Sequence, residues 1–527
     1  MTDKAKKKIE IFDSTLRDGS QGEGISFSVQ DKLNIVKALD DFGVACIEAG
    51  NPGSNPKDLS FFTEIKKLKL KNAKICAFGS TARHNLPVSE DQNVKNILEA
   101  DTEIVAIFGK SWDLHVTEIL RISLEENLRI VTETLDYLKS MGKEVVFDAE
   151  HFFDGYKANS EYALKVLEAA VKGGASTLSL CDTNGGTLPR DIFNITETVV
   201  KTFPNTRVGI HCHDDIGCAV ANSLSAVEAG ATQVQGTFIG FGERCGNADL
   251  STVIANLAFK YDNYDCCVDP SDLKATARQI AAISNIRIRS NHPYVGKSAF
   301  AHKGGMHIDG VQKVSHSFEH IDPAAVGNER KFLLSEMSGR GTVLPKIQKF
   351  APHITKKCPE TQNITDKLKE MEYFGYQYEG ADASFELMIK KELGLWEPHF
   401  KVIMYKAFDD FPAPDGEQQC SGMVKIEVDG ETELTCSSGN GPVNALDQAL
   451  RKAIKVFYPE IETLQLMDYK VRVIDSGNTT DAKVRVLIES ADEESSFTTI
   501  GVSCDVIEAS FIALMDSFEY KLSKKEI

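Results

Sequence analysis

The chain has 527 residues, a length that predicts about three domains. Its hydrophobic content of 42% and charged content of 26% are typical of a soluble globular protein with a full core. The net charge of −18 argues against a nucleic-acid partner, because that binding depends on clustered Lys and Arg. No apolar stretch follows the basic run at residues 4–8, so we expect a solvated tail and neither a signal peptide nor a membrane anchor.

The twelve cysteines are spread along a long chain and do not form a disulfide pattern. Cys46, Cys76 and Cys181 lie inside apolar runs, where a reduced thiol acts as a small hydrophobic side chain. Cys266 and Cys267 are adjacent, which is poor spacing for a zinc site. We therefore expect a reducing, cytoplasmic location.

The first half of the chain alternates short apolar runs with helix-length amphipathic segments. The apolar runs are residues 9–14, 45–50, 74–80, 104–109, 144–151, 177–183, 207–214 and 233–240. Such alternation indicates βαβ units and a parallel sheet, and eight units in about 270 residues match a (β/α)8 TIM barrel. The alternative, an open doubly wound sheet, is less favoured because no G-x-G-x-x-G follows the first strand.

Residues 28–42 illustrate the predicted helices of the barrel. Apolar side chains recur there at helical spacing, at Val29, Leu33, Val36 and Leu39. This pattern places Lys32 and Lys37 on the solvent side, and Gly43 then ends the helix.

Polar side chains follow almost every predicted strand at its C-terminal end. They are Asp13, Glu48, Ser80, Asp148, Glu150, Asp182, Thr183, His211 and His213. A barrel builds its active site at that rim, and a strand buried on both faces has no other evident need for such groups. We therefore expect a catalytic site at the barrel mouth, in a domain spanning residues 1–270.

Two further regions follow the predicted barrel. Residues 271–395 read as helical subdomains that reach back toward the barrel mouth. Residues 396–527 read as a small α+β domain for ligand sensing or dimerisation, with a hairpin turn at Asp429-Gly430 and an amphipathic helix beginning near Pro442. Strands are expected at 483–490 and 498–505 and a closing helix at 506–518.

The residues best suited to bind a metal come from three segments of the rim. His211 and His213 are two apart on a strand, so both side chains point to the same face and reach one ion. The first, seventh and eighth strands are neighbours in a closed barrel, which brings Asp18 and Asn247 to the same place. The alternative interpretation is that the two histidines form a hydrogen-bonded polar pair and bind no metal. The nitrogen and oxygen donors admit zinc, manganese or magnesium, and Asp214 and Asp215 are expected to support the site.

Arg17 precedes the predicted ligand Asp18 in the loop after the first strand. A metal ion with coordination positions that the protein does not fill, next to an arginine, suggests an α-keto acid as the ligand. The carboxylate and keto oxygens of this acid would chelate the ion. Arg17 would then neutralise the charge that develops on the keto oxygen.

Five motifs stand in order along the chain, at residues 13–28, 211–223, 240–250, 299–310 and 441–453. Together they resemble the 2-isopropylmalate synthase and homocitrate synthase family, whose metal-dependent barrel enzymes condense acetyl-CoA with an α-keto acid. Residues 21–32, 51–58 and 326–340 are most similar to its (R)-citramalate synthase branch, which uses pyruvate. Ser20 stands where the isopropylmalate branch usually has Glu, which weakens that assignment.

The resemblance implies a role for each matching residue. Asp18, His211 and His213 would be direct metal ligands, with Asn247 close by or bonding through water. Arg17 and Thr183 would contact the keto acid, and Glu150 would donate or accept a hydrogen bond near the reacting centre.

His307, in a helical subdomain, would help remove a proton from the acetyl methyl, supported by Glu243. His302 and His316 are more readily interpreted as structural.

The resemblance also implies a homodimer inhibited by isoleucine at the C-terminal domain, on the pyruvate route to isoleucine. A relative using 2-oxoisovalerate or 2-oxoglutarate is the nearest alternative, and Phe78, Phe108 and Phe147 are expected to shape the pocket that decides between them. A zinc-barrel hydrolase fits less well, because its His-x-His commonly lies on the first strand. A non-catalytic amino-acid sensor would not need the rim residues.

Overall fold

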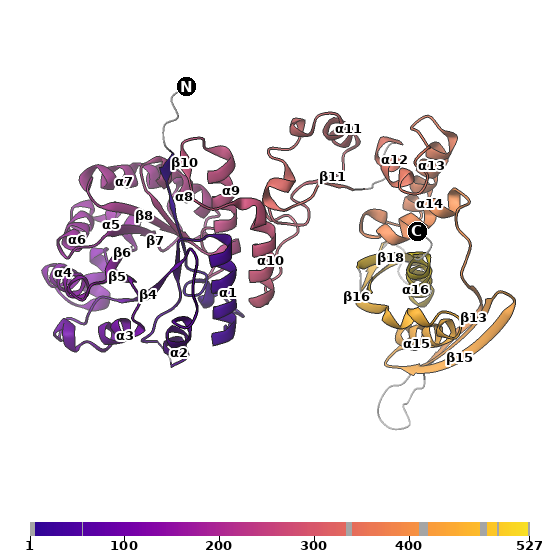
Figure 1. Cartoon of the computed structure of the whole chain (residues 1–527), viewed down its shortest axis with the longest axis horizontal. Helices are drawn as coiled ribbons and strands as arrows, with labels where there is room; N and C mark the ends of the chain where they lie inside the picture. The colour runs from indigo at the N-terminus through magenta and orange to yellow at the C-terminus, as the bar shows by residue number, and fades with distance from the viewer. Residues whose placement is uncertain are drawn as a thin grey trace. The chain divides into compact units, whose positions relative to one another are not determined.

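The structure is a computed structural model that describes residues 6–54, 56–333, 340–409, 420–474, 482–492 and 495–524. It contains two compact units, one formed by residues 1–300 and 321–330 and the other by residues 301–320 and 331–527 (Figure 1). Part of the branch motif at 326–340 therefore lies outside the described residues.

The first unit is a closed barrel of eight parallel strands, as predicted. The strands are β2 (Glu10–Asp13), β3 (Cys46–Glu48), β4 (Lys74–Ser80), β5 (Ile104–Lys110), β6 (Glu144–Glu150), β7 (Thr177–Asp182), β8 (Arg207–Cys212) and β9 (Gln233–Gly236). Each coincides with one of the eight predicted apolar runs, and β5 extends one residue beyond its run, to Lys110. β9 pairs with both β8 and β2, so the first, seventh and eighth strands of the barrel are neighbours.

Helices surround the barrel, as the chain in indigo to magenta shows (Figure 1). They are α1 (Val29–Phe42), α2 (Pro56–Ile65), α3 (Gln92–Ala100), α4 (Leu124–Ser140), α5 (Phe152–Ala158), α6 (Ser160–Lys172), α7 (Pro189–Thr202), α8 (Ala219–Glu228), α9 (Leu250–Lys260) and α10 (Leu273–Ile283). The main core lies between strands and helices. A smaller apolar cluster, which includes Phe12, Cys76 and Val146, fills the barrel interior.

Helix α1 begins and ends where its sequence predicts. Ser28 and Asp31 form a capping box, and Gly43 ends the helix with a φ of 98°. The solvent-side placement of Lys32 is wrong, since this residue is only 3% exposed. Its Nζ donates to Asp58 Oδ1 at 2.6 Å and to Ala49 O at 2.9 Å, and these bonds compensate for burying the charge.

The basic run at the start of the chain contributes a short strand that the sequence did not predict. β1 (Lys7–Lys8) pairs in parallel with β10 (Tyr264–Asp265). The side chains of Lys7 and Lys8 remain exposed, as expected, and residues 4 and 5 of the run lie outside the described residues.

The second unit opens with helices, as expected for this region. They are α11 (Gly305–Lys313), α12 (Arg340–Gln348), α13 (Pro359–Tyr373) and α14 (Asp382–Glu392), and a two-residue pair β11 (Ala301–His302) and β12 (Lys331–Phe332) flanks α11. Ser384 of α14 donates to Asp516 Oδ2 at 2.6 Å and accepts from the amide of Ile500. This helix is therefore packed into the C-terminal part of the unit. The predicted boundary near residue 395 remains a prediction.

The C-terminal part consists of two similar halves, each an antiparallel three-stranded sheet followed by a helix. The first contains β13 (Lys401–Asp409), β14 (Cys420–Val428), β15 (Glu431–Gly439) and α15 (Pro442–Lys455); the second contains β16 (Gln465–Val473), β17 (Val484–Ala491), β18 (Ser496–Ser503) and α16 (Val506–Ser523). The expected turn is present, with φ of 52° at Asp429 and 85° at Gly430. β13 and β16 were not predicted.

Among the residues that the structure describes, we find no helix with the length and apolar character needed to cross a membrane.

Candidate active site

The three predicted metal ligands converge at the C-terminal end of the barrel. One ligand atom from each of Asp18, His211 and His213 lies within 4.8 Å of the others, and all three residues are buried. Asp18 Oδ2 is 3.3 Å from His211 Nε2 and 3.8 Å from His213 Nε2, and the two Nε2 atoms are 3.4 Å apart. The closed barrel explains this convergence of distant segments.

Asn247 completes the cluster from the loop after β9. A β-bridge pairs it with His213, and its Nδ2 donates to Asp18 Oδ1 at 3.0 Å. Its buried Oδ1 has no hydrogen-bond partner among the described residues. An unpartnered amide oxygen beside a carboxylate and two imidazoles is a donor set that fits a divalent cation.

The charges at the cluster suit metal binding. Burial disfavours the charged form of Asp18, but the Arg17 guanidinium and His211 outweigh it and hold the pKa of the carboxyl well below its ordinary value. Burial and the neighbouring His211 lower the pKa of His213 to about 4, so this imidazole is neutral. Asp18 thus offers an anionic oxygen and His213 a free nitrogen lone pair.

Arg17 is held on three sides next to the cluster. Its Nε donates to Glu48 Oε2 at 2.6 Å and its Nη1 to Asp18 Oδ2 at 2.8 Å. Its guanidinium lies 4.0 Å from the centre of the Phe78 ring. Nη2 has no hydrogen-bond partner within the described part of the chain, so the guanidinium is fixed with one end available.

A cavity of about 240 Å³ opens beside this cluster. Its lining residues are Arg17, Asp18, Gln21, Phe78, Phe108, Asp148, Glu150, Cys181, Thr183, His211, His213 and Glu243. Seven of the nine residues predicted for the site are in this lining. The eighth, Asn247, bonds to Asp18 of this lining, and the ninth is His307. Their proposed roles remain predictions.

Thr183 and Glu150 present polar atoms to the cavity from neighbouring strands. The Thr183 hydroxyl accepts a hydrogen bond from the His151 amide at 2.9 Å, which leaves its own hydrogen free to be donated. His151 has a φ of 56°, unusual for a residue other than glycine. Glu150 Oε2 accepts a hydrogen bond from Lys110.

The loop after β9 is tied to the loop after β8. Arg244 binds both carboxylate oxygens of Asp215 at 2.9 and 3.0 Å and lies beside the exposed Glu243. Asp214 Oδ1 accepts from the Ala219 amide at the start of α8. Both aspartates hold loops, which is the supporting role expected of them.

His307 lies in the second unit, on α11. Its side chain is exposed and its ring stacks on Phe318 with a centroid distance of 4.5 Å. His302 instead bonds to the buried Glu319 at 3.0 Å, which agrees with a structural role.

Several residues that were predicted to contribute to the site at the rim do not line the cavity, because their side chains point elsewhere. Asp13 binds Thr15, Asp182 binds Thr187, and Ser80 accepts a bond from Asn93, so these polar groups hold loops and do not line the cavity. Phe147 is also excluded from the cavity: it packs between strands and helices, because its neighbours Val146 and Asp148 face the barrel interior.

The lining also includes Gln21 and Cys181, which were not predicted for the site, and Asp148, which was predicted only as a residue of the rim. Gln21 follows Asp18 by three residues in a short helical turn, so its place within the first motif was the available signal. Asp148 precedes Glu150 by two on β6 and shares its face.

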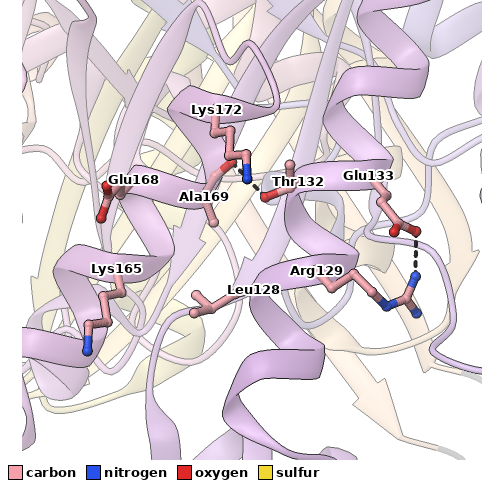
Figure 2. Close-up of a pocket in the computed structure, with 8 residues that line it drawn as sticks. All are labelled: Leu128, Arg129, Thr132, Glu133, Lys165, Glu168, Ala169 and Lys172. Carbon is pink, nitrogen blue, oxygen red and sulfur yellow. Dashed lines mark hydrogen bonds and ion pairs between the residues drawn. The ribbon is translucent and has the colours of Figure 1, made fainter.

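A larger hollow, of about 550 Å³, lies on the outer side of the barrel between α4 and α6 (Figure 2). Figure 2 shows Leu128 between the two helices and the Arg129–Glu133 ion pair at one side. None of the predicted site residues lies there, so the cavity at the barrel mouth remains the candidate.

Comparison with known proteins agrees with this architecture. Residues 8–280 match the HMGL-like family, residues 294–373 the homocitrate synthase post-HMGL domain-like family, and residues 379–522 the LeuA allosteric (dimerisation) domain.

Full-length relatives narrow the assignment. An (R)-citramalate synthase of Aquifex aeolicus is 52% identical over 99% of both chains, and one of Geobacter sulfurreducens is 48% identical over 98% of both. A 2-isopropylmalate synthase of Methanocaldococcus jannaschii is 30% identical, over 98% of this chain and 96% of its own. The expected branch is confirmed: the chain belongs to the (R)-citramalate synthase family.

Proposed function

We propose that this chain condenses acetyl-CoA with pyruvate and hydrolyses the resulting thioester, which gives (R)-citramalate and CoA. The observation that carries this proposal is 52% identity across essentially the whole length of a protein named (R)-citramalate synthase. The buried Asp18, His211 and His213 cluster beside a fixed arginine supports it chemically.

The proposed metal ligands are Asp18, His211 and His213, with Asn247 as a fourth or a water-linked partner. A divalent ion bound there would supply Lewis-acid polarisation of the keto group of pyruvate. Zinc, manganese and magnesium all suit the nitrogen and oxygen donors.

Arg17 and Thr183 are proposed to bind and orient the keto acid. The free Nη2 end of Arg17 and the free hydrogen of the Thr183 hydroxyl are both donors at the cavity wall. Because Arg17 is already fixed by Glu48 and Asp18, it stabilises negative charge on the keto oxygen without reorganising.

The chemistry of the acetyl group is assigned to His307, with support from Glu150 and Glu243. His307 removes a proton from the acetyl methyl, and the resulting enolate carbon forms a bond to the keto carbon of pyruvate. The keto oxygen takes up a proton and becomes the tertiary hydroxyl. Water then attacks the thioester carbonyl, which releases CoA as its thiol and leaves citramalate. A positioned base contributes about 10²–10⁴-fold to such a step.

The apolar wall of the cavity bears on the choice of keto acid. Phe78 and Phe108 stack with a centroid distance of 5.3 Å and form an apolar wall of the 240 Å³ space. Each added methylene changes binding by about 1–3 kcal/mol in an apolar pocket, so pyruvate and 2-oxoisovalerate must be distinguished by assay.

A thiol-release assay with acetyl-CoA and three keto acids tests the proposed reaction. Pyruvate is expected to give the highest kcat/KM, ahead of 2-oxoisovalerate and 2-oxoglutarate, and the product is expected to be (R)-citramalate by chiral chromatography. A preference for 2-oxoisovalerate would assign the chain to the isopropylmalate reaction instead.

We also propose that the chain forms a homodimer through its C-terminal domain and that isoleucine inhibits it there. The match of residues 379–522 to the LeuA allosteric (dimerisation) domain supports this proposal. The edge strand β16 adds a structural argument, because Val471 and Val473 are on one face and are 46% and 54% exposed. Inhibition by isoleucine, compared with leucine as a control, tests the effector.

The twelve cysteines, all among the described residues, are thiols and not disulfides, which fits the cytoplasm that we propose as the location.

A further inference from the structure

The two histidines of the proposed metal site are held very differently. His213 Nδ1 is buried and has no hydrogen-bond partner among the described residues. His211 Nδ1 lies 3.1 Å from Oε1 of Gln235, a fully buried residue. His211 and Gln235 are directly paired in the register of β8 and β9, so the strands themselves bring these two side chains together.

We propose that Gln235 is a positioning residue: it determines which ring nitrogen of His211 carries the hydrogen, and it thereby aims the lone pair of Nε2 at the metal. This inference rests on the proposed metal site. It adds to that site a residue that does not touch the ion.

The direction of each hydrogen bond follows from a chain of side chains through the barrel interior. Glu10 is paired with Arg207 at 2.7 Å, so its carboxylate can only accept. Gln233 must therefore present its Nε2 to Glu10, at 2.7 Å, which leaves its Oε1 facing Gln235. Gln235 in turn must present its own Nε2 to that oxygen, at 3.3 Å.

Asp148 fixes the same amide from the other side. Its Oδ1 accepts from Gln235 Nε2 at 3.1 Å. With its nitrogen committed to two acceptors, Gln235 has only its Oε1 for His211. The Nδ1 of His211 must then be the donor, so the neutral ring that binds a metal presents its lone pair at Nε2. That Nε2 is the atom 3.3 Å from Asp18 Oδ2 and 3.4 Å from His213 Nε2.

Partners of this kind orient metal-bound histidines, and their loss typically weakens metal binding by about 10–100-fold. Gln235→Leu removes the acceptor without adding charge. Gln233→Leu is the matched control, because Gln233 lies two residues earlier on the same strand, is equally buried, and contacts no proposed ligand. Asp148 still holds the Gln235 amide in that control.

The experiment measures the Zn²⁺ affinity of the metal-free, full-length chain by competition with a chromophoric chelator. We expect Gln235→Leu to raise the Kd for Zn²⁺ about 10–100-fold and Gln233→Leu to leave it unchanged. Equal affinities for wild type and Gln235→Leu, or equal losses in both variants, would overturn the inference. Gln235→Met, closer in shape to glutamine, replaces the leucine variant if that protein does not fold.

A second measurement needs no change at Gln235. In the wild-type protein with ¹⁵N-labelled histidine, the two-bond couplings of His211 report whether Nδ1 or Nε2 is protonated, and His211→Gln identifies its signals. We expect Nδ1 to carry a hydrogen in both the metal-free and the Zn²⁺-loaded protein, and an Nδ1 without a hydrogen in either state would contradict the proposal. If the wild type bound no Zn²⁺, the proposed metal site itself would fail, and that result is distinct from a metal-binding protein in which Gln235 has no effect.

Discussion

Arg17 and Glu48 form a buried ion pair in which Nε donates to Oε2 at 2.6 Å. Glu48 is fully buried at the end of β3, and the same oxygen also accepts from Ser14 Oγ at 2.5 Å. Because two donors hold Glu48 Oε2, the carboxylate keeps its position and restrains the guanidinium. This pair fixes the guanidinium before substrate arrives, which is the condition for electrostatic catalysis without reorganisation.

Glu48→Gln weakens this restraint while leaving a side chain of the same size. We expect kcat/KM for pyruvate to fall about 10²-fold, the cost typical of misplacing a substrate-binding group by 1 Å. Glu144→Gln is the control, since Glu144 pairs with Arg207 at 2.9 Å at the start of its strand. If both variants lost activity equally, the Arg17–Glu48 pair would be a structural feature only.

Asp18→Asn is expected to remove tight metal binding. The substitution replaces the anionic member of the cluster by a neutral amide, so we expect the Kd for Zn²⁺ to rise by more than about 10²-fold, beyond the effect of an indirect partner. Asp215→Asn should leave the Kd near wild type, because within the described part of the chain its carboxylate binds Arg244 and no proposed ligand. Metal content by mass spectrometry checks both, and a fully metal-loaded Asp18→Asn protein would contradict the assignment.

His307→Ala is expected to lower kcat about 10²–10⁴-fold if His307 is the base. Zn²⁺ affinity should stay at the wild-type value, since the proposed ligands are all in the barrel. His316→Ala is the control, because His316 is also an exposed histidine of the same segment. Steady-state assays at saturating substrates make the comparison, and full activity of His307→Ala would rule out this role.

Asp40 is expected to contribute to acid stability. It is 4% exposed, and its carboxylate accepts from the amides of Lys71, Asn72 and Ala73 at 2.8–3.1 Å. Burial opposes the charge, but these amides outweigh it, and the pKa lies below the ordinary value of 3.8. The unfolded chain thus takes up the proton first as pH falls, so this stabilisation is present above pH 4 and is lost below it.

Asp40→Asn should therefore cost about 1–3 kcal/mol at neutral pH and progressively less in acid. Urea unfolding at pH 7 and near pH 3 measures the difference. Asp41→Asn serves as the comparison, because that side chain is 61% exposed and its effect should be small. A cost for Asp40→Asn that did not change with pH would show that the charge is irrelevant.

Val471→Asp is expected to convert the proposed dimer to a monomer. A charge on the exposed apolar face of β16 opposes burial against a second copy. Met141→Asp, at a position 51% exposed beyond the end of α4, should leave the assembly unchanged. Sedimentation velocity distinguishes the two, and a dimeric Val471→Asp protein would move the interface elsewhere.

The barrel was predictable because buried parallel strands leave continuous apolar runs, and all eight appear as strands. The metal cluster was predictable because barrel closure places the first and last strands together. β16 was missed although apolar and charged side chains alternate in it from Met467 to Val473, and its face is left largely exposed in the structure. Lys32 was misplaced because helical periodicity cannot reveal a partner such as Asp58 on the next helix.

The direction of the side chain at the end of a strand also could not be predicted from the sequence. Asp13 and Asp148 both end or nearly end a strand, yet Asp13 binds Thr15 beside its own loop while Asp148 faces the interior. A shift of one residue in the strand would turn a side chain that bonds within its loop into one that faces the barrel interior, and the reverse. The sequence therefore located the site but not every residue that lines it.

The bond between Asn247 and Asp18 joins residues 229 positions apart, across the strands that close the ring. A nascent chain cannot assemble this cluster until both β2 and β9 have left the ribosome and paired. Such a non-local contact forms late in folding, after most of the loop entropy has been lost. A cation that binds only the closed barrel stabilises the folded state. At a concentration 100 times its Kd, it adds about 2.7 kcal/mol to the free energy of unfolding. Metal supply would thus govern how long the finished barrel survives, as well as how fast it works.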